Sequence, residues 1–127
     1  MGENKGYIRN TDEKGSINIS EDVIAVISAA AASEVEGVHG LFFTPAKELT
    51  NMLGRKNQSR GIKLLIDGDN LVIDVYIIAD MGYSVSEVGA EIQKVVMSAV
   101  EAAVGVAVTS VNVHICGVSL KKNKPNS

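Results

Sequence analysis

The chain has 127 residues, and its formal net charge of −3 argues against general nucleic-acid binding. Its length is that of one ordinary domain. The core must be built from Val, Ile, Leu and Ala, because the hydrophobic fraction is 46% while aromatic residues contribute only 4%. A single cysteine excludes an intrachain disulfide, and the sequence has neither a signal peptide nor an apolar stretch long enough for a bilayer span. We therefore expect a cytoplasmic protein without a membrane span of its own.

The first regular elements predicted are a short strand over residues 16–19 and a helix directly after it. Ser20 has the residue type of a helix N-cap, and Glu21 and Asp22 put negative charge in the first turn, where the helix dipole favours it. Apolar residues then recur at helical spacing, at Val23, Ile27, Ala30, Ala31 and Val35. This stripe predicts a helix that packs on a sheet and ends near Gly37.

A β-hairpin is predicted where apolar residues alternate on both sides of the turn-forming segment 67–70. Its inward residues are Ile62, Leu64 and Ile66 on the first strand and Leu71, Ile73, Val75, Ile77 and Ala79 on the second. The other face of the second strand is mostly apolar, although a solvent-facing strand should be polar there. We predict that its residues Val72, Tyr76 and Ile78 form an interaction face. The alternative is that segment 45–60 folds over them.

The second helix is the clearest element. Ser84 and Glu87 have the spacing of a capping box, an apolar stripe runs from Val85 to Ala103, and Gly105 ends the helix. A long strand over 106–117 follows, with a bend near Thr109 and Ser110. With a short strand over 38–43, the expected order is β-α-β-β-β-α-β. The fold class is α/β (α+β), with two helices packed on one face of a small mixed β-sheet.

We expect a single domain over residues 15–120, between a flexible N-terminal segment, residues 1–14, and a flexible basic tail, residues 121–127. Segment 45–60 is expected to contain a short helix over 46–53 and then an exposed basic loop. Candidate contacts to an anion, a lipid headgroup or a nucleic acid are Arg55, Lys56, Arg60 and Lys63, together with the lysines of the tail.

Residues that could carry out chemistry are scarce. His114 and Cys116 share a strand face, but a structural zinc site needs four ligands, and only His39 is an obvious addition. Gly37-Val38-His39-Gly40 matches the GxxG loop of a KH domain, yet it lacks a basic residue and is better explained as a helix cap and a turn. We predict no catalytic, cofactor-binding or metal-binding residues. An enzyme that uses His114 and Cys116 is the third alternative.

Several segments, in this order and spacing, resemble the alkaline shock protein, or Gls-type, envelope stress response family of Gram-positive bacteria. They are residues 15–24 with 34–38, residues 85–88 with 92–93, and residues 105–106 with 111–118. The resemblance covers roughly residues 14–120. It implies a non-enzymatic cytosolic protein that self-associates and docks to a membrane-anchored partner, which would hold it near the membrane. It supplies no catalytic residues.

Overall fold

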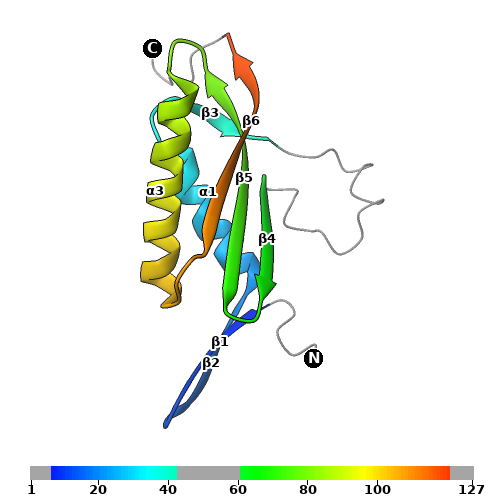
Figure 1. Ribbon diagram of the computed structural model, residues 1–127, viewed down its shortest axis with the longest axis vertical. Coiled ribbons are helices and arrows are strands. Elements are labelled where there is room, and N and C mark those ends of the chain that lie inside the picture. The colour runs from blue at the N-terminus through cyan, green and yellow to red at the C-terminus, as the bar shows by residue number, and fades with distance from the viewer. Residues whose placement is uncertain (1–6, 43–60, 121–127) are drawn as a thin grey trace, which may run out of the picture.

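The computed structural model describes residues 7–42 and 61–120. The strands in these ranges are β1 (Tyr7–Asp12), β2 (Gly15–Ser20), β3 (Val38–Leu41), β4 (Ile62–Asp67), β5 (Asn70–Asp80) and β6 (Ser110–Ser119), and the helices are α1 (Glu21–Ser33) and α3 (Val85–Val104). The predicted α+β class, with two helices and a mixed sheet, is confirmed (Figure 1). The expected helix over 46–53 lies outside the described residues.

Strand β5 is the centre of the main sheet. Strand β6 pairs parallel with one edge of β5, while β3 and β4 pair antiparallel with it. The strands β3 and β4 lie end to end along the second edge, since the Phe42 N–H donates to the Tyr76 carbonyl and the Tyr76 N–H donates to the Gly61 carbonyl, each at 2.8 Å. The predicted hairpin is the β4–β5 pair, in which Ile66 faces Leu71 and Ile62 faces Val75.

Residues 1–14 were expected to be flexible, but the structure has strand β1 over Tyr7–Asp12. Residues 7–12 pair antiparallel with β2, from Tyr7 opposite Ser20 to Asp12 opposite Gly15. The resulting two-stranded hairpin projects beyond one end of the sheet (Figure 1). A hairpin that projects from the sheet has little core to cover, as the 63% exposure of Ile17 on β2 shows. The sequence of β1 therefore shows no apolar alternation. The expected division of the chain into a domain and two flanking segments stays a prediction.

Helix α1 begins as predicted, with the Ser20 hydroxyl accepting a hydrogen bond from the Val23 N–H at 3.4 Å. The predicted stripe is wrong by about one residue, because Val23 is 46% exposed whereas Ile24 and Ala25 are fully buried. The helix is apolar almost all round, so several stripes are compatible with its sequence. Ser28 can join the buried face because its hydroxyl donates to the Ile24 carbonyl at 2.8 Å.

Helix α3 agrees with its prediction at both ends. Ser84 caps it by accepting from the Glu87 N–H at 3.3 Å, and Gly105 ends it with a φ of 83°. Its buried face consists of Val88, Ile92, Val96, Val100 and Val104. These residues pack with the buried residues of α1 and with the inward side chains of β4 and β5 to form one core.

Strand β6 starts later than the sequence suggested. Residues 105–109 are not in a strand, and the Val108 N–H donates to the Glu101 carboxylate at 2.9 Å. The shift in register lies further along, between Ile77 and Ile78 of β5, where Cys116 has no partner residue. Thr109, where a bend was expected, is thus the last residue of the irregular connection between α3 and β6. The bulge of β6 is at Cys116.

Candidate functional site

The predicted interaction face lies on the side of β5 turned away from the core. Val72, Tyr76 and Ile78 are each half-buried, and they alternate with the fully buried inward residues of the same strand. Leu65 of β4 stands opposite Val72 and is 58% exposed. The structure thus places the three predicted residues on one face. Their role in an interaction stays a prediction.

The middle of this face is more polar than the alternation suggested. Asp74 accepts a hydrogen bond from the Asn112 side-chain amide at 3.1 Å, and its Oδ1 lies 3.0 Å from His114 Nε2. The His114 ring stacks on Tyr76, with centroids 4.4 Å apart and an interplanar angle of 13°. Burial, followed by the charge of Asp74 and then Cys116, raises the pKa of Tyr76. The stacking and the hydrogen bonds fix this cluster in one arrangement.

Of the predicted anion contacts, the structure describes only Lys63. It lies on β4, is half-buried and stands opposite Asp74 in the register of the two strands. Arg55, Lys56, Arg60 and the tail lysines lie outside the described residues. The Asp74 carboxylate itself is bound by Asn112 and His114 of β6.

The residues considered for chemistry are not brought together. His39 Nδ1 lies 3.0 Å from Asp80 Oδ1, whereas His114 is bound to Asp74, and six residues of β5 separate these carboxylates by about 20 Å. The Cys116 thiol contacts the His114 carbonyl at 3.7 Å, and its partial burial raises its pKa. Across residues 7–42 and 61–120, no group of three or more His, Cys, Asp or Glu side chains could hold a metal ion.

The GxxG match forms a turn and the start of a strand. Gly37 has a φ of 97°, and its carbonyl accepts from the Asp80 N–H at 2.8 Å, while Gly40 pairs with Ile78 within the β3–β5 ladder. A KH loop holds a nucleic-acid backbone with exposed glycines, and Gly37 is buried. Helix α1 already ends at Ser33, so Gly37 belongs to the following turn rather than to the helix cap.

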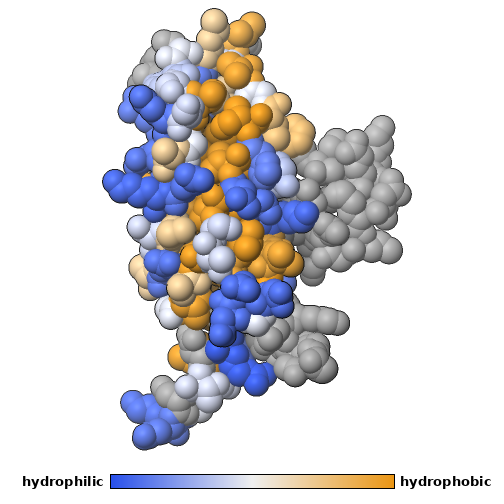
Figure 2. Space-filling model, in the orientation of Figure 1, coloured by the Kyte–Doolittle hydropathy of each residue, from blue (hydrophilic) through white to orange (hydrophobic). Residues whose placement is uncertain are grey.

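A second surface, which the sequence did not reveal, lies along β6. Within the described residues, β6 pairs with β5 on one side only. The Val111 carbonyl accepts from the Gln93 side-chain amide of α3 at 3.0 Å, so it points away from β5. Because backbone groups alternate in direction along a strand, those of Val113 and Ile115 point to the same open side. Figure 2 shows an apolar band over β6 and the adjacent side of α3.

A shallow groove of about 320 Å³ runs beside this open edge, between α3 and β6. Its lining residues are Val85, Ser86, Gly89, Ala90 and Gln93 from the helix and Val113 and Ile115 from the strand. Gly89, within the helix, contributes no side chain to this groove, and a Cβ there would lie 4.0 Å from Val113 Cγ1. A glycine inside a predicted helix was the one sequence signal that could have drawn attention to this position.

The sequence profile of the alkaline shock protein family, which is described by its "cell envelope-related function", matches residues 9–120. The chain belongs to this family. The family resemblance seen in the sequence is thereby confirmed, and the family's function is related to the cell envelope. In residues 7–42 and 61–120, no helix has the length and apolar character that crossing a membrane requires.

Three bacterial relatives match most of the chain. The uncharacterized protein YloU of Bacillus subtilis is 38% identical over 106 residues, which are 82% of this chain and 88% of YloU. YqhY of the same organism is 31% identical over 82% of this chain and 77% of its own length. The uncharacterized protein Spy1535 of Streptococcus pyogenes is 34% identical over 118 residues, or 91% of this chain and 89% of the relative.

Among solved structures, variants of the MamM CTD have a similar arrangement of elements. One of them is aligned with a TM-score of 0.47 and 20% sequence identity, over 76% of this chain and 93% of that domain. A second, described as a nickel form, gives a TM-score of 0.47 and 19% identity over 76% of this chain and 96% of that domain.

Proposed function

We propose that this protein is a non-catalytic interaction protein that self-associates through the open edge of β6. In the proposed assembly, β6 of one copy pairs antiparallel with β6 of a second copy, and the two sheets become continuous. Side chains of the partner strand occupy the groove beside the edge. Such strand addition uses main-chain hydrogen bonds for affinity and side-chain pockets for specificity.

The observation that carries this proposal is Gly89. A glycine inside a helix destabilises it by about 0.5–1 kcal/mol relative to alanine. The backbone does not require it, because its φ is not positive, and a Cβ would meet only one atom, at an ordinary contact distance of 4.0 Å. The fold therefore gives no reason for glycine at this position. Its effect is to leave the groove open beside Val113 and Ile115.

The composition of β6 supports the same assignment. Its sequence, SVNVHICGVS, contains no Asp, Glu, Lys or Arg. Exposed sheet edges are usually protected against pairing by charged residues, and the short strand β4, on the opposite edge, carries Lys63 and Asp67. A neutral strand of ten residues lacks that protection. Two copies related by a twofold axis would present the same strand to each other in antiparallel orientation.

For the role near the envelope, we propose docking to a membrane-anchored protein through Val72, Tyr76 and Ile78. The envelope-related description of the family and the position of these residues on the face opposite the helices support this step. The protein would then be cytoplasmic and close to the membrane. Binding of an anion or lipid headgroup by Arg55, Lys56, Arg60 and Lys63 is the alternative.

Sedimentation equilibrium of the full chain tests the self-association. Gly89→Lys would fill the groove with a charged side chain, so we expect the dissociation constant to rise at least tenfold, about 1.4 kcal/mol. The same change removes a helix-interior glycine, so the melting temperature should stay the same or rise. Ala102→Lys adds the same charge at an exposed position of α3 and should associate as the wild type does.

Ile78→Asp tests the role of the outer face of β5 separately from that of the β6 edge, because the substituted residue lies on β5. We expect it to self-associate normally and to lose capture of a membrane protein from crosslinked cells. A wild-type chain that stays monomeric at high concentration would rule out the proposal. So would a Gly89→Lys chain that associates normally.

A further inference from the structure

Charge is strongly segregated along this chain. Residues 7–42 and 61–120 hold 13 acidic and 4 basic side chains, a net charge of −9. The other residues hold 2 acidic and 8 basic side chains, a net charge of +6, which brings the total to the −3 of the whole chain. These two ranges are thus far more acidic than the whole chain, and the compensating charge lies in residues 1–6, 43–60 and 121–127.

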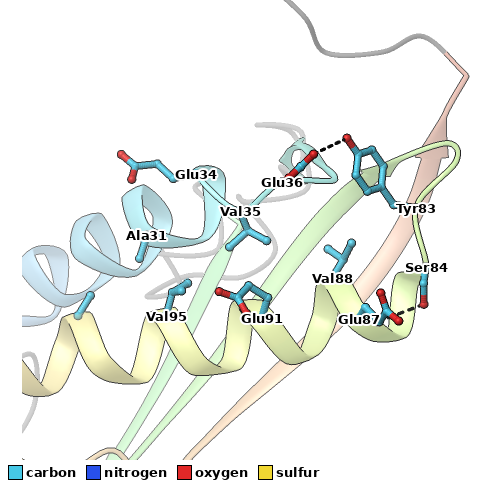
Figure 3. A pocket seen from close by; sticks show the side chains of 11 residues that line it. Ala31, Glu34, Val35, Glu36, Tyr83, Ser84, Glu87, Val88, Glu91 and Val95 are labelled. Carbon is cyan, nitrogen blue, oxygen red and sulfur yellow. Dashed lines mark hydrogen bonds between the residues drawn. The ribbon is translucent and has the colours of Figure 1, made fainter.

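Four of these thirteen acidic side chains line a groove between the end of α1 and α3 (Figure 3). The groove has a volume of about 640 Å³, and four exposed glutamates line it: Glu34, Glu36, Glu87 and Glu91. None of its eleven described lining residues is Lys, Arg or His. Four carboxylates around one groove repel each other, and a cation among them would offset this repulsion.

The floor of the groove is apolar. Val35, just after α1, and Val88 of α3 point toward each other there, and both are buried (Figure 3). At one end the Tyr83 hydroxyl donates to the Glu36 carboxylate at 3.2 Å, and this hydrogen bond raises the pKa of Tyr83. An apolar floor with an acidic rim suits a lysine, whose alkyl stem packs on apolar surface while its ammonium group stays at the rim.

We propose that this groove binds the lysine-rich segment 121–124 of the same chain. Strand β6 ends beside the groove, since the Ser119 carbonyl accepts from the Met81 N–H at 2.9 Å, and Met81 is two residues before Tyr83. Four residues span about 13 Å when extended, enough to pass along the Tyr83 end of the groove. Three of these four residues are lysines, and four glutamates line the groove, so the charges of segment and groove are complementary.

A zero-length carbodiimide crosslinker tests this proposal on the full chain, because it joins an amine to a carboxylate only when the two are in contact. Equal amounts of ¹⁴N- and ¹⁵N-labelled protein are mixed, crosslinked at low salt and analysed by mass spectrometry. We expect Lys121, Lys122 or Lys124 joined to the four groove glutamates. The two joined peptides should carry the same label. The yield should exceed that of crosslinks to Asp67 and Asp69, two exposed carboxylates in the β4–β5 turn, at least tenfold.

Salt should remove these crosslinks, since exposed charges more than about 3 Å apart are screened at 1 M ionic strength. Joined peptides of mixed label would place the segment of a second copy in the groove and overturn the assignment to the same chain. Equal yields at Asp67 and Asp69, or no groove crosslinks at all, would overturn the proposal. As a second measurement, Lys→Gln at positions 121, 122 and 124 together should shift the amide resonances of Tyr83, Ser84 and Glu87. Unchanged resonances would also overturn the proposal.

Discussion

Replacing Gly37 with alanine is expected to lower the free energy of unfolding by about 3 kcal/mol, because two separate costs combine. The residue has a φ of 97°, a conformation that side chains rarely adopt. A Cβ would also lie 2.7 Å from Val88 Cγ2 and 3.0 Å from Tyr83 Cγ, so the floor of the acidic groove would have to move. Urea denaturation of Gly37→Ala measures the loss.

Gly82 provides a matched control, since its φ is 100° but no atom lies within 4 Å of the position of a Cβ. Gly82→Ala therefore carries the backbone cost alone, about 1–2 kcal/mol. The difference between the two variants gives the cost of the overlap with Val88 and Tyr83. Equal losses in the two variants would show that the contact at Gly37 is not close packed.

The second large effect is expected at Ile92, which is fully buried in the middle of α3. Ile92→Ala removes three carbon atoms from a core that α1, the sheet and α3 share, and we expect it to lower the free energy of unfolding by about 2–5 kcal/mol. Alanine is a good helix former, so the loss reports packing rather than helix propensity. Urea denaturation with an unchanged m-value would show that the unfolded state is unaffected.

Val26 of α1 is the control for Ile92. It is 51% exposed, so Val26→Ala should change the free energy of unfolding by less than 1 kcal/mol and could raise it through helix propensity. A large loss at Val26 with a small loss at Ile92 would mean that the buried face of the helix layer is assigned incorrectly.

The elements predicted correctly are those whose apolar residues can be assigned to only one face of a helix or strand. Helix α3 has a polar side with Glu91 and Lys94, so its apolar stripe could be assigned, and the β4–β5 hairpin has a clear alternation around its turn. Helix α1 has no such polar side, and its buried stripe was misplaced although both its start and its type were correct. Strand β1 was missed because a projecting hairpin buries little and shows no apolar pattern.

The candidate surfaces were harder to predict than the fold, because each depends on which segments meet in space. Alternation along β5 correctly placed Val72, Tyr76 and Ile78 on one face, but it could not show that Asp74 binds Asn112 and His114 there. The edge position of β6 follows from strand order, which no single segment encodes. The acidic groove unites Glu36 with Glu87 and Glu91, residues about fifty positions apart along the chain.

Hydrogen exchange of the full chain at two concentrations tests the pairing of β6 most directly. The N–H groups of Val113 and Ile115 are expected to exchange rapidly in dilute solution, because they point to the open side of the sheet. At a concentration where the protein self-associates, their exchange should slow at least tenfold, while the amides of β4 keep their rates. Unchanged exchange at Val113 and Ile115 in solutions where sedimentation shows a larger species would contradict self-association through this edge.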